Sequence, residues 1–195
     1  MKKNSKVIIA FLLMLLLITQ LTSPVSALIQ YDGVSVTPIQ QAKRYWCWAA
    51  CAEMVGKYFK PDTSKTQWDV VRATKGTEDE PYPDVSGTAT ECALGASYVS
   101  LLAKGFKVTS VLGNSDLVSE MKNDYPVIAG TRGVSSSIGH AVVITGTELR
   151  DINAQVSNYI YYIDPWDGTM HMCLYQAFCD GSYNGMEYAL SIVVK

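Results

Sequence analysis

Histidine is scarce in this chain, because its 195 residues include only His140 and His171. A metal site built from several imidazoles is therefore nearly excluded, and a histidine that acts as a base has only two candidates. The five cysteines contain no Cys-x-x-Cys pair, which also disfavours a zinc site. We expect a protein that requires neither a metal nor an organic cofactor.

An excess of positive charge is missing as well. The chain has 16 Lys and Arg against 18 Asp and Glu, a formal net charge of −2, which argues against the clustered basic face that nucleic-acid binding needs. Only 17% of the residues are charged and 48% are hydrophobic, which excludes a disordered chain. Repeats and linkers are absent, so we expect one folded domain that acts as a monomer.

Long apolar runs are missing beyond residue 27, and the run before it is short. Lys2, Lys3 and Lys6 precede the apolar residues 7–18, and small residues follow up to Ala27. This run falls short of the ~20 residues of a membrane span, whereas the whole pattern is typical of a signal peptide. We predict cleavage after Ala27, a secreted or extracellular domain over residues 28–195, and no stable membrane insertion afterwards.

The order of elements predicts an α+β fold. Residues 28–38 are expected to be extended, and helices are predicted over 47–59, 64–74, 88–104 and from 114 or 115 to 124. Strands are predicted over 126–129, 139–147, 156–163, 168–174 and 187–194. Helices that come first and strands that come second favour segregated layers over alternating βαβ units.

Two helix starts carry capping-box patterns, and the loop between them is acidic. Ser64 with Gln67 and Thr88 with Glu91 have the spacing of capping boxes. The loop, residues 77–87, contains Glu78, Asp79 and Glu80 and is either a solvated segment or the rim of a cleft that attracts basic substrate residues.

The segment from Gln41 to Ala50 is the most informative stretch. Cys47 comes directly before a periodic apolar run, so it should lie in the first turn of a helix, where free N–H groups and the helix dipole stabilise a thiolate. The Gln41 amide, six residues earlier, could donate to an oxyanion together with the Cys47 N–H. The alternative is that Cys47 is a buried core thiol.

This segment, Gln-x5-Cys-Trp-Ala-Ala, resembles the papain-like cysteine peptidases, and most of all a compact bacterial branch that includes secreted effector proteases and bacteriocin-leader peptidases. The resemblance implies an N-terminal helical half packed against a C-terminal antiparallel β-sheet or barrel half. It also implies peptide-bond hydrolysis and a protein or peptide substrate. The other cysteines are open: Cys51 should face the core, and Cys173 could bridge Cys179.

His140 and Asp164 complete the predicted site. His140 begins one apolar strand and Asp164 ends the next, and a hairpin brings the start of one strand beside the end of the other. The imidazole would accept the thiol proton, and the carboxylate would orient it. Trp166 could shield their hydrogen bond from water. His171 is the competing base, with no acid expected to pair with it, and Asp164 could instead be a simple turn residue before Pro165.

Three functions remain open at this stage. The first is a secreted cysteine endopeptidase with Cys47, His140 and Asp164 as its triad and Gln41 in its oxyanion hole. The second uses the same triad as an amidase or endopeptidase on cell-wall peptides. The third is a binding module or toxin in which the motif is inactive.

Overall fold

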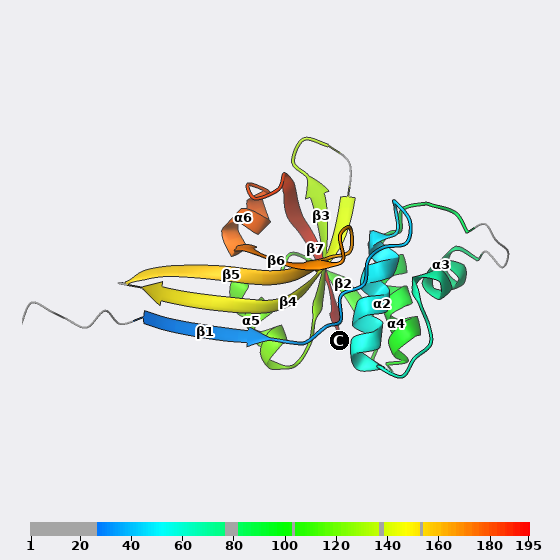
Figure 1. The fold of residues 1–195 in the computed structure, drawn as a ribbon, viewed down its shortest axis with the longest axis horizontal. Helices are drawn as coiled ribbons and strands as arrows, with labels where there is room; N and C mark the ends of the chain where they lie inside the picture. The colour runs from blue at the N-terminus through cyan, green and yellow to red at the C-terminus, as the bar shows by residue number, and fades with distance from the viewer. Residues whose placement is uncertain (1–26, 77–81, 103, 137–138, 153) are drawn as a thin grey trace, which may run out of the picture.

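The computed structural model of the protein describes residues 27–76, 82–102, 104–136, 139–152 and 154–195. A helical half packs beside an antiparallel sheet of seven strands in these ranges (Figure 1), which confirms the α+β prediction. The predicted signal peptide lies outside the described residues except for Ala27, and so does the acidic run from Glu78 to Glu80. None of the helices in the described ranges has the length and apolar character that a bilayer crossing requires.

Helix α2 (Cys47–Phe59) is the centre of the helical half. Its apolar residues recur at helical spacing, and Trp48, Cys51 and Val55 are buried. The chain leaves the helix just before Pro61, which cannot continue it. Gly56 allows a close approach to the neighbouring helix, because a Cβ there would collide with Val99 of α4.

Helices α3 (Gln67–Lys75) and α4 (Ala89–Ser100) follow, and their caps test the sequence predictions. The Thr88–Glu91 capping box is confirmed, although α4 ends at Ser100 with Leu101 in the left-handed conformation rather than at residue 104. The predicted Ser64–Gln67 box is wrong, because Thr66 and Asp69 form it instead. Gln67 has a different role, described below.

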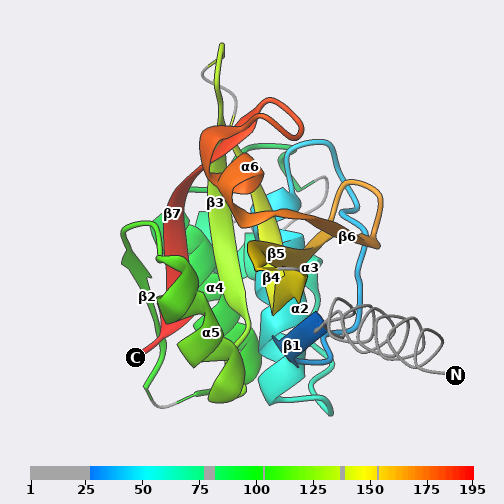
Figure 2. The same cartoon turned by 90° about the vertical axis from the view of Figure 1, so that its left-hand side faces the viewer.

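The sheet has the order β2–β7–β3–β4–β5–β6, and β1 pairs with the far half of β4. Its strands are β1 (Ala27–Gly33), β2 (Phe106–Thr109), β3 (Val127–Gly133), β4 (Gly139–Ile152), β5 (Gln155–Asp164), β6 (Thr169–Leu174) and β7 (Met186–Val194). Helices α2 and α4 lie on one face of the sheet, and α5 (Asn114–Lys122) and α6 (Tyr175–Asp180) lie on the other (Figures 1 and 2). Because both faces are covered, the middle of β4 is buried at consecutive positions from Ala141 to Glu148.

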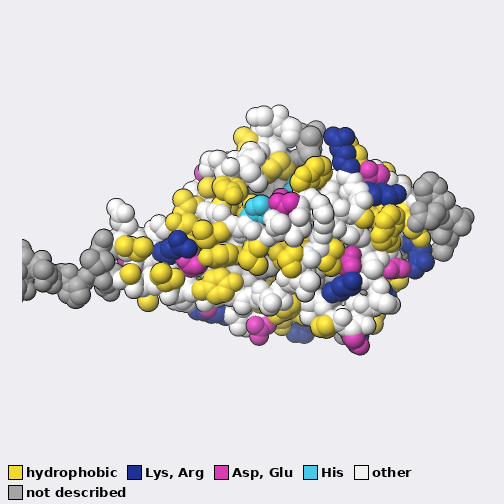
Figure 3. Space-filling model, viewed as in Figure 1, with side chains coloured by type: hydrophobic (Ala, Val, Ile, Leu, Met, Phe, Trp, Pro, Cys, Tyr) yellow, Lys and Arg dark blue, Asp and Glu magenta, His cyan; other side chains and the backbone are white. Residues whose placement is uncertain are grey.

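Several elements differ from their predicted extent. Strand β3 continues to Gly133 and β4 to Ile152, whereas β2 and α6 were not predicted. The cap of α5 is Gly113 rather than Asn114 or Ser115. The extra length of β4, together with β1 and the start of β5, forms an arm that extends from the body and exposes apolar side chains (Figure 3).

The β4–β5 hairpin brings two predicted site residues together, as the sequence indicated. Its last paired residues at the body end are Val143 and Ile163, so His140 and Asp164 lie just beyond the ladder on adjacent strands. Strand β3 supports the other side of His140, with Thr131 as its cross-strand partner. Two paired strands therefore fix the position of the imidazole.

Candidate active site

Cys47 is the first residue of α2 and lies at the edge of a cleft between the helical half and the sheet. Trp46 precedes the helix, and its carbonyl accepts the N–H groups of Ala49 and Ala50. The N–H of Cys47 belongs to the first turn, in which backbone donors have no helical acceptor. The sulfur therefore lies where the partial positive charge of the helix N-terminus favours a negative charge.

Trp46 and Trp48, on either side of Cys47 in the sequence, bind the segment that precedes α4 through their indole N–H groups. Trp46 Nε1 donates to the carbonyl of Pro83 at 2.9 Å, and Trp48 Nε1 donates to the carbonyl of Val85 at 3.2 Å. Gly87 packs directly against the Trp48 ring, where any Cβ would collide with the indole. One wall of the cleft is thus held against the nucleophile by two tryptophans.

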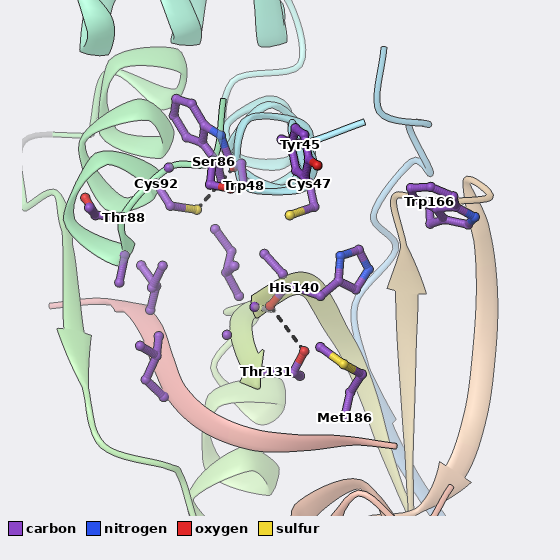
Figure 4. Close-up of a pocket in the computed structure, with 18 of the residues that line it drawn as sticks. Tyr45, Cys47, Trp48, Ser86, Thr88, Cys92, Thr131, His140, Trp166 and Met186 are labelled. Atoms are coloured by element: carbon purple, nitrogen blue, oxygen red, sulfur yellow. Dashed lines mark hydrogen bonds between the residues drawn. The ribbon is translucent and has the colours of Figure 1, made fainter. Parts of the chain in front are cut away.

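His140 faces Cys47 across the cleft (Figure 4). Its ring is paired with Asp164. Its Nε2 lies 2.7 Å from Asp164 Oδ1, which also accepts the backbone N–H of Trp166 at 2.8 Å. Burial lowers the pKa of His140, but the hydrogen bonds and charges of Asp164 and Cys47 raise it more, and its pKa is about 10. The surroundings therefore favour an imidazolium beside the sulfur.

The cleft has a volume of about 730 Å³ and is mostly uncharged. Its walls come from the starts of α2 and α4, from β3, β4 and β7, and from the turn after β5. Its charged or titratable lining residues, apart from cysteines and Tyr45, are Arg44, His140 and Asp164. In the ranges that the structure describes, no three His, Cys, Asp or Glu side chains gather as a metal site would require.

Gln41 lies in the loop before Cys47, but its amide is engaged within that loop. Its Nε2 donates to the carbonyls of Lys43 at 2.9 Å and Arg44 at 2.7 Å, which uses both amide hydrogens. Its Oε1 is buried and has no hydrogen-bond partner in the described part of the chain. Gln41 is not among the residues that line the cleft. Its role as an oxyanion donor therefore stays a prediction.

Gln67 and Asp84 position the loop before Cys47 through contacts that the sequence did not predict. Gln67, at the start of α3, accepts the backbone N–H of Ala42 through Oε1 and donates to the carbonyl of Gln40 through Nε2. Asp84 accepts the backbone N–H of Tyr45 at 2.9 Å. Both contacts join segments more than twenty residues apart, and no local pattern marks them.

His171 does not line the cleft. The expectation that no acid pairs with it is wrong, because its Nε2 lies 2.9 Å from Asp167 Oδ2. Its ring stacks on Tyr162, with a centroid separation of 5.3 Å. Trp166 lines the cleft with 59% of its surface exposed, so it stands at the rim, and its shielding of the His140–Asp164 hydrogen bond stays a prediction.

The cysteines form no disulfide in this structure, so Cys173 and Cys179 are not bridged. Cys51 is fully buried in the core, as predicted. Cys92 lines the cleft, donates its S–H to the carbonyl of Trp48 at 3.2 Å, and has a pKa raised by burial and by Cys47.

The α+β fold, with a cysteine at a helix N-terminus facing a sheet-borne histidine, defines the class of papain-like cysteine peptidases. The model of the Peptidase_C39 like family matches residues 34–190. The chain belongs to this family, which supports its assignment as a cysteine peptidase. No curated protein matches the chain.

Proposed function

We propose that this protein is an exported cysteine endopeptidase that hydrolyses peptide bonds through Cys47, His140 and Asp164. The observation that carries the proposal is the position of His140, which hydrogen-bonds Asp164 at 2.7 Å and faces the sulfur of Cys47. A thiol nucleophile, a base and an orienting acid lie in one cleft. The family supports peptidase chemistry, and the assignment of each residue is our own.

The reaction begins with the proton on His140 and the negative charge on Cys47. The thiolate attacks the carbonyl carbon of the scissile bond, and the carbonyl oxygen takes the negative charge. The Cys47 N–H stabilises that oxyanion, because it is an unpaired donor of the first helical turn. His140 then gives its proton to the leaving amine, which departs and leaves an acyl group on the sulfur.

The acyl group is removed by water. His140, now neutral, accepts a proton from a water molecule that attacks the thioester carbonyl, and the acid product leaves as the thiolate re-forms. Asp164 holds the ring through Nε2 during both steps, so the same nitrogen of His140 always faces the sulfur.

Gln41 is our second oxyanion donor. For this role its amide must leave the carbonyls of Lys43 and Arg44 when substrate binds, because both hydrogens are otherwise used. We also propose export through residues 1–27, with Leu28 as the new N-terminus, and action as a monomer. N-terminal sequencing of the exported protein tests whether cleavage leaves Leu28 as the new N-terminus.

The direct test of function is cleavage of casein and of a peptide library by the purified protein. Wild type should cleave both, and Cys47→Ala should cleave neither. Cleavage by Cys47→Ala at the wild-type rate would remove the proposed nucleophile. Purified peptidoglycan in a parallel assay separates a protein substrate from a cell-wall peptide, and inactivity on every substrate would favour a binding role.

A further inference from the structure

Arg44 differs from every other arginine of the chain. Arg72, Arg132 and Arg150 each form an ion pair, with Asp69, Glu187 and Glu148 respectively. Arg44 has no carboxylate within ion-pair distance in the part of the chain that the structure describes. It is also the only arginine that lines the cleft.

The backbone around Arg44 is held in place on both sides. The carbonyl of Arg44 accepts the Gln41 amide at 2.7 Å, and the N–H of the next residue, Tyr45, donates to Asp84. Lys43 Nζ donates to the carbonyl of Tyr82 at 2.6 Å. The backbone position of Arg44, three residues before the nucleophile, is therefore well defined.

The guanidinium of Arg44 lies against the ring of Tyr45, with 5.4 Å between its carbon and the ring centroid. This contact restricts the side chain but uses none of its five N–H donors. Figure 4 shows Tyr45 beside Cys47 at the mouth of the cleft. An exposed cation, whose donors have no hydrogen-bond partner in the described part of the chain, therefore lines the cleft near Cys47.

We propose that Arg44 is a specificity-determining residue that binds a carboxylate of the peptide substrate. A planar guanidinium pairs with a carboxylate through two parallel hydrogen bonds, and Arg44 is the one cation among the described lining residues besides the proposed base. The inference rests on the proposed function, because it names the substrate class of the same cleft. The carboxylate could come from a Glu or Asp side chain or from the C-terminus of the peptide.

The net charge of the protein makes this preference informative. The chain carries −2 overall, so its general field disfavours an acidic peptide, and a preference for one requires a local cation. An exposed ion pair changes affinity by about 2- to 5-fold, and bidentate geometry increases this. We expect a preference of about 3- to 10-fold for a carboxylate-bearing peptide over its neutral twin.

The test uses matched fluorogenic peptides that differ at one position. Glu, Gln and Lys are placed in turn at each of the three residues on either side of the scissile bond, and a second set compares a free C-terminus with its amide. The full-length protein, its Arg44→Gln variant and its Lys107→Gln variant are compared. Lys107 is an exposed residue of β2, so its substitution changes net charge equally away from the cleft.

Wild type and Lys107→Gln should prefer the Glu peptide over its Gln twin at one position, or the free C-terminus over its amide. In Arg44→Gln, the ratio of kcat/KM for the carboxylate-bearing peptide to kcat/KM for its neutral twin should fall to about one. The preference should also shrink as salt rises from ~50 mM to ~500 mM, because exposed charges are screened. A preference for Lys peptides, or a Glu preference that survives Arg44→Gln, would overturn the inference.

A binding measurement separates this inference from the proposed function. The Cys47→Ala protein, with and without Arg44→Gln, is titrated with the same peptide twins. A carboxylate preference that depends on Arg44, without any turnover by wild type, would sink the peptidase proposal and keep the carboxylate site. Turnover and binding that are both indifferent to the carboxylate would sink the site and keep the peptidase.

Discussion

The ring of His140 lies 2.7 Å from a carboxylate oxygen of Asp164, although the two residues stand at opposite ends of a β-hairpin in the sequence. The same oxygen accepts the N–H of Trp166, so the turn after β5 also holds the carboxylate. This double anchoring connects the fold to the proposed chemistry, because it directs the other nitrogen of His140 toward Cys47.

Substitution of Asp164 should alter the pH dependence of activity. The pKa of His140 is raised to about 10, so the imidazolium persists below that pH and is lost above it. Asp164→Asn keeps an acceptor but removes a charge that raises this pKa. The alkaline limb of the kcat/KM profile should therefore move to lower pH, with a loss of rate at neutral pH of about tenfold or less.

Asp164→Ala is the matched comparison, since it removes the acceptor as well. We expect a rate loss of about 10²- to 10⁴-fold, because neither the tautomer nor the orientation of His140 is then held. An alkaline limb that stays in place in both variants would show that Asp164 does not act on His140.

The two histidines should respond very differently to substitution. His140→Ala should reduce kcat by about 10³-fold or more, because it removes the proposed proton carrier. His171→Ala removes a surface pair with Asp167 and a stacking contact with Tyr162, and should lower stability by about 1 kcal/mol or less. Steady-state kinetics and thermal unfolding of both variants check this. Equal loss of activity in the two would contradict the assignment of the base.

Gln41 allows a test of two roles. If its amide reaches the oxyanion, Gln41→Ala should lower kcat by about 10²- to 10³-fold with little change in KM. If it acts only on the carbonyls of Lys43 and Arg44, the variant should lose thermal stability and a smaller part of its activity. Gln67→Ala is the control. It removes the hydrogen bond from the Ala42 N–H and so loosens the same loop, but Gln67 is not a proposed oxyanion donor.

Gly87 should tolerate no side chain. A Cβ at this position would collide with the indole of Trp48, so Gly87→Val should cost about 1–3 kcal/mol of unfolding free energy and reduce kcat/KM. Gly113→Ser is the control. It also adds a side chain to a glycine, but at the N-cap of α5, a position that accepts serine readily. A fully stable and active Gly87→Val protein would show that the Trp48 wall is not rigid.

The sequence carried enough local information to predict the elements that present the site. Helical spacing from Cys47 onward, the Thr88–Glu91 box and the continuous apolar run of β4 all describe neighbours along the chain. The hairpin rule then brought His140 beside Asp164 without knowledge of the rest of the fold.

What could not be predicted depends on contacts between distant segments. Gln67 was expected to cap a helix, but Thr66 and Asp69 form the capping box of α3. The Gln67 amide is therefore left to bind the backbone of Gln40 and Ala42. The short β2 owes its position to pairing with β7, about 85 residues later, and such pairing leaves no local pattern.

The most direct test of the central claim is covalent labelling by an epoxide that reacts with thiolates, mapped to single cysteines by mass spectrometry. We predict one rapidly formed adduct, on Cys47, in the native protein, while the buried Cys51 and Cys92 stay unlabelled. The adduct should form far more slowly in His140→Ala, because the imidazolium both stabilises the thiolate and protonates the opening epoxide. Labelling of Cys47 at the same rate in both proteins, or of neither, would contradict the account.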